Sequence, residues 1–175
     1  MAIRTRLVGQ GLAGADLRSL LLDLKTANVE ERVRLKGERP KIKESDLRRL
    51  RETDPWELVL AALRDTFSME LDVEPFNDLY HSYIRVLVYK GELVGSRFTK
   101  VAGYNKRDIM VEGAGFLQWL SVFAFAVDPR FDILLLDEPD AHLHHSFRFS
   151  LCSVFVRSQQ QPGSSSWSPP TRPRF

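Results

Sequence analysis

A short apolar segment that ends in two acidic residues constrains the fold of this chain more than any other feature. Residues 133–136 read Ile-Leu-Leu-Leu, and Asp137, Glu138 and Pro139 follow them directly. An apolar run of this length, closed by a proline, is typical of a strand buried on both faces of a parallel sheet. Open α/β sheets bind their ligands at the carboxyl ends of the strands. The sequence therefore predicts an α/β fold in which both acids emerge at that edge of the sheet.

Two adjacent carboxylates at the end of a dry strand favour a metal-binding and catalytic role. Buried charges are costly unless a cation or a reacting water uses them. In a Walker B site, the first acid binds the Mg²⁺ that accompanies the nucleotide, and the second polarises the attacking water. The sequence therefore predicts Asp137 as the metal ligand and Glu138 as the general base.

The residues around these acids resemble a known ATPase family. Residues 134–144 read Leu-Leu-Leu-Asp-Glu-Pro-Asp-Ala-His-Leu-His, similar to the Walker B motif and D-loop of an ABC-type ATPase. Within that group the segment is most similar to the AAA-family ATPases of the SMC, RecF and OLD branch. Residues 111–120 read Val-Glu-Gly-Ala-Gly-Phe-Leu-Gln-Trp-Leu. They stand where this family has its signature motif, Gly-Ser-Gly-x-x-Gln at the start of a helix.

The resemblance implies the C-terminal part of a P-loop NTPase, with a mixed sheet and an N-terminal helical segment. It implies ATP and Mg²⁺ as ligands and a homodimer in the intact protein. The signature residues Gly113, Gly115 and Gln118 would then meet the γ-phosphate bound by the opposite subunit. By the same resemblance, Asp140 and His142 would occupy the D-loop at the dimer interface.

Three features of the family are missing from these 175 residues. No Gly-x-x-x-x-Gly-Lys-Ser/Thr motif occurs, so there is no Walker A loop to hold the phosphates. Ala114 stands where the signature has serine, which removes a hydroxyl contact typically worth about 0.5–1.5 kcal/mol. The switch histidine that the resemblance leads one to expect after the D-loop is also absent. Because the Walker A loop and this histidine are both missing, we expect the chain to be inactive as an ATPase in isolation.

Three segments are expected along the chain. Residues 1–82 form a helical insertion or arm, and residues 83–150 form an ATPase core fragment that carries the signature helix, the Walker B strand and the D-loop. Residues 151–175 form a tail that is predicted to be disordered, because its final part lacks periodicity and is rich in Ser, Pro and Arg.

The end of the tail suggests a shift of reading frame. With suitable codons for Ser164–Phe175, translation from the third nucleotide gives Leu-Val-Leu-Val-Ala-Thr-His-Ser-Pro-Glu-Ile. This is the strand and switch-histidine motif that the resemblance leads one to expect after the D-loop. Our hypothesis is that the tail is a frameshifted translation of the C-terminus, which sequencing of the gene would test.

Two amphipathic helices are predicted in the first segment. Leucines at 17, 20, 21 and 24 share one helical face, and Asp16 is a candidate cap. Asp54, Pro55 and Glu57 occupy the N-cap, N1 and N3 positions of a second helix, whose apolar face includes Trp56. The charged residues 30–51 between them are interpreted as a solvated helix–loop–helix. A DNA-binding face is less favoured there because acidic residues are interleaved with the basic ones.

The periodicity changes from helical to alternating after these helices. Residues 83–89 are predicted to form a strand, Lys90-Gly91-Glu92 a turn, and residues 97–101 a further strand of an antiparallel element. A strongly apolar helix is expected over residues 116–126.

The amino-acid composition gives little information on the class of binding partner. The net charge of +2 gives no strong argument for nucleic acid or a membrane, and no apolar run approaches the ~20 residues of a membrane span. The single cysteine, Cys152, excludes an internal disulfide and fits the cytoplasm, which is the compartment we expect. DNA or a partner protein stays a further candidate ligand, because relatives of this fold serve DNA repair, phage defence and transport alike.

Two other functions compete with the ATPase interpretation. A metal-dependent hydrolase could use the histidine cluster formed by His142, His144 and His145 with Asp140, since His and carboxylate ligands bind Zn²⁺ or Mn²⁺. A non-enzymatic remnant could fold only beside a partner that supplies the missing lobe. Our interpretation favours the ATPase for the ancestry of the chain and the remnant for the isolated polypeptide.

Overall fold

The computed structural model describes residues 13–95 and 97–131. The predicted Walker B strand, the D-loop and the tail over residues 151–175 lie outside this part of the chain. The described elements, in chain order, are α1 (Ala13–Lys36), α2 (Glu44–Thr53), α3 (Pro55–Phe67), β1 (Met69–Val73), β2 (Val86–Val94), β3 (Arg97–Lys100), β4 (Arg107–Asp108), the 3₁₀ helix η1 (Ile109–Val111) and α4 (Ala114–Val127).

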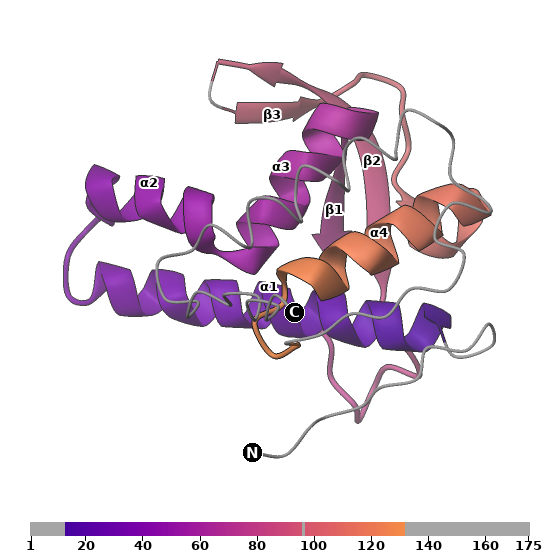
Figure 1. Ribbon diagram of the computed structural model, residues 1–175, viewed down its shortest axis with the longest axis horizontal. Helices are drawn as coiled ribbons and strands as arrows, with labels where there is room; N and C mark the ends of the chain where they lie inside the picture. Colours follow the sequence, from indigo (N-terminus) through magenta and orange to yellow (C-terminus); the bar gives the residue numbers. More distant parts are fainter. Residues whose placement is uncertain (1–12, 96, 132–175) are drawn as a thin grey trace, which may run out of the picture.

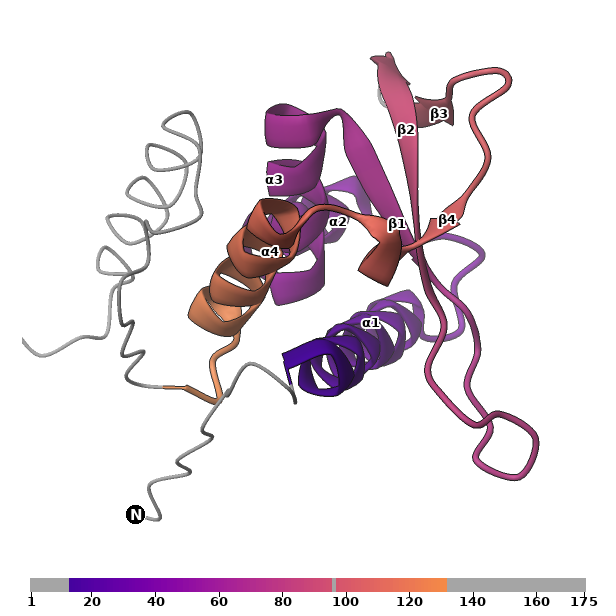
Figure 2. The same ribbon diagram turned by 90° about the vertical axis from the view of Figure 1, so that its right-hand side faces the viewer.

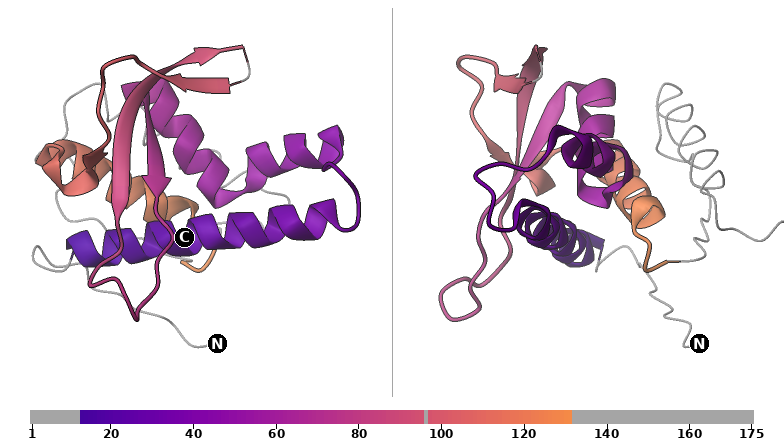
Figure 3. Two further views of the ribbon diagram at one scale, coloured as in Figure 1. Left: turned by 180° about the vertical axis from the view of Figure 1, so that it is seen from behind. Right: turned by 90° about the vertical axis from the view of Figure 1, so that its left-hand side faces the viewer.

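The four strands form a small antiparallel sheet built around β2 (Figure 1). The first half of β2 pairs with β1 on one side, where Val88 faces Leu71, and with β4 on the other, where Leu87 faces Asp108. The second half of β2 continues past β1 and pairs with β3, so that Leu93 faces Phe98. The sheet therefore ends in a two-stranded hairpin that projects beyond the helices (Figure 3).

Helices α1, α3 and α4 cover one face of the sheet (Figure 2). The residues of β1 alternate between buried and half-buried, and the buried ones point toward the helices. The largest fully buried side chain is that of Trp119 on α4. The core also contains Leu20, Leu21, Val59, Leu63, Val86, Val88, Ile109 and Leu120, all with no exposed surface. The fold is thus mixed α/β with four helices and a small antiparallel sheet in the described residues.

The helical predictions for the first segment are confirmed. The four leucines at 17, 20, 21 and 24 are buried on one face of α1, although the helix begins at Ala13, so Asp16 lies in its first turn. Asp54 caps α3, because its carboxylate accepts a hydrogen bond of 3.1 Å from the amide of Glu57. The charged residues 30–51 form the end of α1, a loop and most of α2, as predicted.

The turn predicted at Lys90-Gly91-Glu92 is wrong, because β2 runs through it without a break. Gly91 pairs with Lys100 inside the hairpin, and a Cβ atom on Gly91 would lie 2.3 Å from Cε1 of Phe98. The glycine is needed for this close approach of an aromatic ring, and the chain reverses at Gly95, which has a positive φ of 65°. The strand predicted at residues 97–101 is confirmed as β3.

Residues from both sides of position 82 share one sheet and one hydrophobic core. Strand β1 pairs with β2 along its whole length, and the core combines side chains of α1 and α3 with those of β2 and α4. Strand β1 itself was not predicted from the sequence. No helix within residues 13–95 and 97–131 is long and apolar enough to cross a membrane.

Candidate functional site

The predicted signature motif forms the beginning of α4, as the sequence indicated. Gly113 is the N-cap, in extended conformation and exposed, and the helix continues from Ala114 to Val127. Gly115 lies half-buried in the first turn, and Gln118 follows one turn later. The three signature residues therefore lie together at one helix terminus. The opposite end of α4 leads, through residues 128–131, to the segment that contains Asp137 and Glu138, residues 132–140, which we call the acidic segment.

The first backbone amides of α4 have no hydrogen-bond partner among the described residues. No side chain caps this helix, and the amides of Ala114 and Gly115 make no hydrogen bond to another described residue. The amides of Phe116 and Leu117 bond to the carbonyl of Gly113 at 3.0 and 3.2 Å. The space next to Cα of Gly113 is open, with no atom within 4 Å of an added Cβ. Such a helix end favours an anion.

Two polar atoms on α4 are buried without a hydrogen-bond partner among the described residues. They are the carboxamide oxygen of Gln118 and the indole nitrogen of Trp119. Trp119 is held by aromatic contacts, with its ring 5.0 Å from Phe67 and 5.0 Å from Phe123, centroid to centroid. Of the three signature residues, Gln118 thus has an acceptor atom that this part of the chain leaves unpaired.

The segment that leads to the predicted Walker B strand is anchored to α1 and α4. Arg130 forms an ion pair with the buried Asp128 at 2.8 Å and a second with Asp23 of α1 at 2.9 Å. Hydrogen bonds to these two carboxylates raise the pKa of Arg130. The ring of Phe131 packs edge-on against Phe125 at 5.3 Å between centroids. The chain is therefore held in a defined place at the point where the acidic segment begins.

The other predicted site residues lie outside the described residues. They are Asp137, Glu138, Asp140 and His142, together with the histidines at 144 and 145. Within residues 13–95 and 97–131, no group of three or more His, Cys, Asp or Glu side chains is placed to bind a metal ion. The assignments of the metal ligand, the catalytic base and the D-loop stay predictions.

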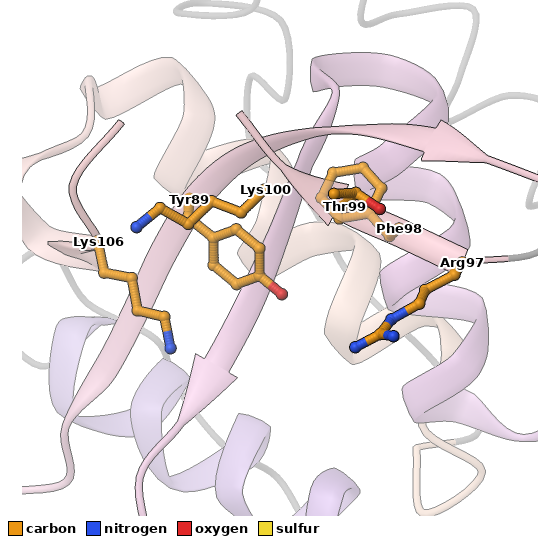
Figure 4. A pocket seen from close by; sticks show the side chains of 6 residues that line it. All are labelled: Tyr89, Arg97, Phe98, Thr99, Lys100 and Lys106. Atoms are coloured by element: carbon orange, nitrogen blue, oxygen red, sulfur yellow. The ribbon is translucent and has the colours of Figure 1, made fainter. Parts of the chain in front are cut away.

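A second surface feature, which the sequence analysis did not identify, lies on the hairpin. Side chains of β2, β3 and the following loop surround a shallow hollow of about 460 Å³ (Figure 4). Its lining consists of two aromatic rings, three cations and a threonine: Tyr89, Phe98, Arg97, Lys100, Lys106 and Thr99. We call these six residues the hairpin surface. The interleaving of aromatic and basic residues along positions 89–107 is the signal that could have revealed it.

Cations approach the aromatic rings of this region closely. The ammonium of Lys106 lies 5.5 Å from the ring centroid of Tyr89, and the guanidinium of Arg64 lies 5.5 Å from that of Phe98. Lys106 also forms an ion pair with Asp72, and that hydrogen bond raises the pKa of Lys106. Burial, followed by the charge of Glu70, raises the pKa of Tyr89.

Comparisons with known proteins assign no relative to this chain. No protein-family model matches the sequence, and no curated protein and no solved structure matches it.

Proposed function

We propose that this chain carries the C-terminal half of an ABC-type ATPase site within a P-loop NTPase fold. The observation that carries the proposal is the order of two motifs. A glycine-initiated helix with free amides, α4, ends at Val127, and the segment Leu-Leu-Leu-Asp-Glu-Pro-Asp-Ala-His-Leu-His begins at residue 134. The anchoring of Arg130 to α1 supports the proposal, because it gives the acidic segment a fixed starting point beside α4.

The proposed reaction is the hydrolysis of ATP to ADP and inorganic phosphate. Asp137 would hold Mg²⁺ through its carboxylate oxygens, which are of the kind that this ion prefers, and the ion would supply positive charge to neutralise the phosphates. Glu138 accepts a proton from the attacking water, whose oxygen forms the new bond to the γ-phosphorus while the bond to the ADP oxygen breaks. The free amides of Ala114 and Gly115 stabilise negative charge on the transferred phosphoryl group.

The proposed site is shared between two subunits. A phosphate-binding loop of the Walker A type does not occur among the 175 residues, so the nucleotide must be held by residues of another lobe. We propose that α4 meets the γ-phosphate of a nucleotide held in this way, with Gln118 close to it. Asp140 and His142 then lie at the interface between the two subunits, in the intact homodimer.

Equilibrium binding of a fluorescent ATP analogue to the 175-residue chain tests the proposal. We expect Mg²⁺-dependent binding, weak because the Walker A loop is missing. It should be lost in Asp137→Ala and reduced in Gly115→Asp, which places a negative charge at the start of α4. Glu138→Gln is the matched control, because it keeps the shape of the base and should retain binding. Binding that does not respond to Mg²⁺ or to Asp137→Ala would contradict the proposal.

A further inference from the structure

Tyr89 of the hairpin surface lies on the side of the sheet opposite the core helices, whereas Phe98 lies beside the end of α3, with Arg64 over its ring. Val86 and Val88 of β2 are buried against the helices, so Tyr89 points to the other side. Its ring lies near the middle of the hollow, with Lys106 on one side and Arg97 on the other (Figure 4). The start of α4 lies elsewhere in the molecule (Figure 1), so this surface is separate from the candidate nucleotide site.

The cations of the hairpin surface are only partly neutralised. Lys106 is paired with Asp72. Arg97 and Lys100 are exposed, and neither forms an ion pair with another described residue. The hollow therefore has an excess of positive charge, which attracts an anionic ligand.

The aromatic rings of this surface do not belong to the hydrophobic core. Tyr89 and Phe98 are half-buried, their centroids are 6.1 Å apart, and their planes are inclined by 55°. Neither residue is among those that form the core. The hydroxyl of Tyr89 makes no hydrogen bond to another described residue. Two rings at the bottom of a cationic hollow are a place where flat, apolar groups of an anionic ligand can pack.

We propose that the hairpin surface binds single-stranded nucleic acid. Bases stack on Tyr89 and Phe98, and the phosphates of the same strand lie against Arg97 and Lys100. This combination of stacking rings and flanking cations distinguishes single-strand binding from the two nearest alternatives. Duplex DNA offers phosphates but keeps its bases stacked inside, and an acidic peptide offers charge without flat rings. DNA and RNA present the same bases and phosphates, so both are ligands of this chemistry.

The test measures fluorescence anisotropy of labelled oligothymidylate and oligouridylate with the full 175-residue chain, at low ionic strength and without ATP or Mg²⁺. We expect binding of both strands that weakens as salt is added, since phosphate contacts release counterions. The stronger of the two identifies the preferred nucleic acid. A DNA duplex of equal length should bind at least several-fold more weakly. Omission of ATP and Mg²⁺ keeps this result independent of the proposed ATPase site.

Two variants separate stacking from charge. Tyr89→Leu keeps an apolar side chain but removes the stacking ring, and should weaken binding by at least about fivefold. Arg97→Glu/Lys100→Glu should weaken it by at least about tenfold. The matched control is Arg39→Glu/Lys41→Glu in the loop between α1 and α2. It exchanges two exposed cations for two acids, as the hairpin variant does.

The control should retain affinity within about twofold, because its cations belong to the loop between α1 and α2 and do not line the hollow. Thermal melting followed by circular dichroism should show that every variant keeps the wild-type transition. Three results would overturn the proposal: equal losses in the two double variants, duplex bound as tightly as single strand, or Tyr89→Leu without effect while polyglutamate competes for the surface. The last result would identify an acidic-peptide surface.

Discussion

The two sides of the sheet differ in what their side chains do. On the inner side, Val86 and Val88 of β2 are fully buried under the helices together with Trp119 of α4. On the outer side, Tyr89 is half-buried and Arg97 and Lys100 are exposed. The inner side removes apolar area from water, which is the dominant stabilising contribution to folding. The outer side buries little apolar area and keeps unpaired charges.

This difference shows which residues are required for folding and which are available for binding. A side chain that stabilises the fold can be recognised by its burial and its many contacts. A cation on a hairpin that lacks a partner contributes little to stability, since even exposed ion pairs are typically worth only about 0–1 kcal/mol. We therefore expect substitutions on the inner side to change stability and substitutions on the outer side to change binding.

The largest effect is expected on the inner side, from Trp119→Ala. This residue has no exposed surface and contacts Phe67 and Phe123 through its ring. Its removal should lower the free energy of unfolding by about 3–5 kcal/mol, measured by urea denaturation. Leu93→Ala, on the hairpin, is the control and should cost less than about 0.5 kcal/mol because that leucine is 64% exposed. Equal losses of unfolding free energy in the two variants would contradict the expected difference between the inner and outer sides of the sheet.

The next effect is expected in the hairpin of β2 and β3, from Gly91→Ala. The added Cβ would lie 2.3 Å from the ring of Phe98 and 2.6 Å from the carbonyl oxygen of Thr99. The hairpin must shift, and overpacking of this kind costs about 1–3 kcal/mol. Glu92→Ala, one position along the same strand and exposed, should be close to neutral in the same denaturation experiment. A neutral Gly91→Ala would mean that the Phe98 ring is not held against this strand.

A smaller effect is expected at the cap of α3, from Asp54→Ala. The variant removes the acceptor of the Glu57 amide and of the Asn28 side chain, which donates to Asp54 at 2.9 Å. The expected loss is about 1 kcal/mol of unfolding free energy. Asp54→Ser keeps a capping oxygen and should recover most of this loss in a thermal melt. If serine and alanine behaved alike, the cap would not be the cause.

The smallest effect on stability is expected on the outer side, from Asp72→Ala. Both side chains of its ion pair with Lys106 are exposed, 42% for Lys106 and 36% for Asp72, so solvent screens the interaction. We expect a change below about 1 kcal/mol in unfolding free energy. The pKa of Lys106, followed by NMR, should fall toward its ordinary value, because its main cause is lost. Tighter oligonucleotide binding should accompany it, whereas Glu38→Ala, in the loop between α1 and α2, should leave the affinity unchanged.

Periodicity and capping were sufficient to predict the helices. The leucine spacing of α1 and the Asp54-Pro55 start of α3 are local signals, and the structure follows both. Helix α4 was also predicted, because Gly113 and Gly115 precede a long apolar run. Each of these elements is determined by residues within a few positions of one another.

The strands were predicted less well, because their pairing depends on residues far apart in the chain. Strand β1 has only five residues and follows α3 after the single residue Ser68, and its alternation gains meaning only from the partner β2. The tripeptide Lys90-Gly91-Glu92 has the composition of a turn, but the ring of Phe98 packs over Gly91 from the neighbouring strand. The hairpin surface was missed for the same reason, since Lys106 reaches Tyr89 only through the folded sheet.

Photocrosslinking tests most directly whether the nucleotide binds at α4 and the acidic segment. An ATP analogue with a photoreactive group on its γ-phosphate is added with Mg²⁺, and labelled tryptic peptides are identified by mass spectrometry. Cleavage after Arg107 and Arg130 gives a peptide, residues 108–130, that contains the whole signature helix. We predict label in this peptide and in residues 131–148, and none on Tyr89 or Phe98. Label confined to the hairpin, with residues 108–148 unmodified, would contradict the account.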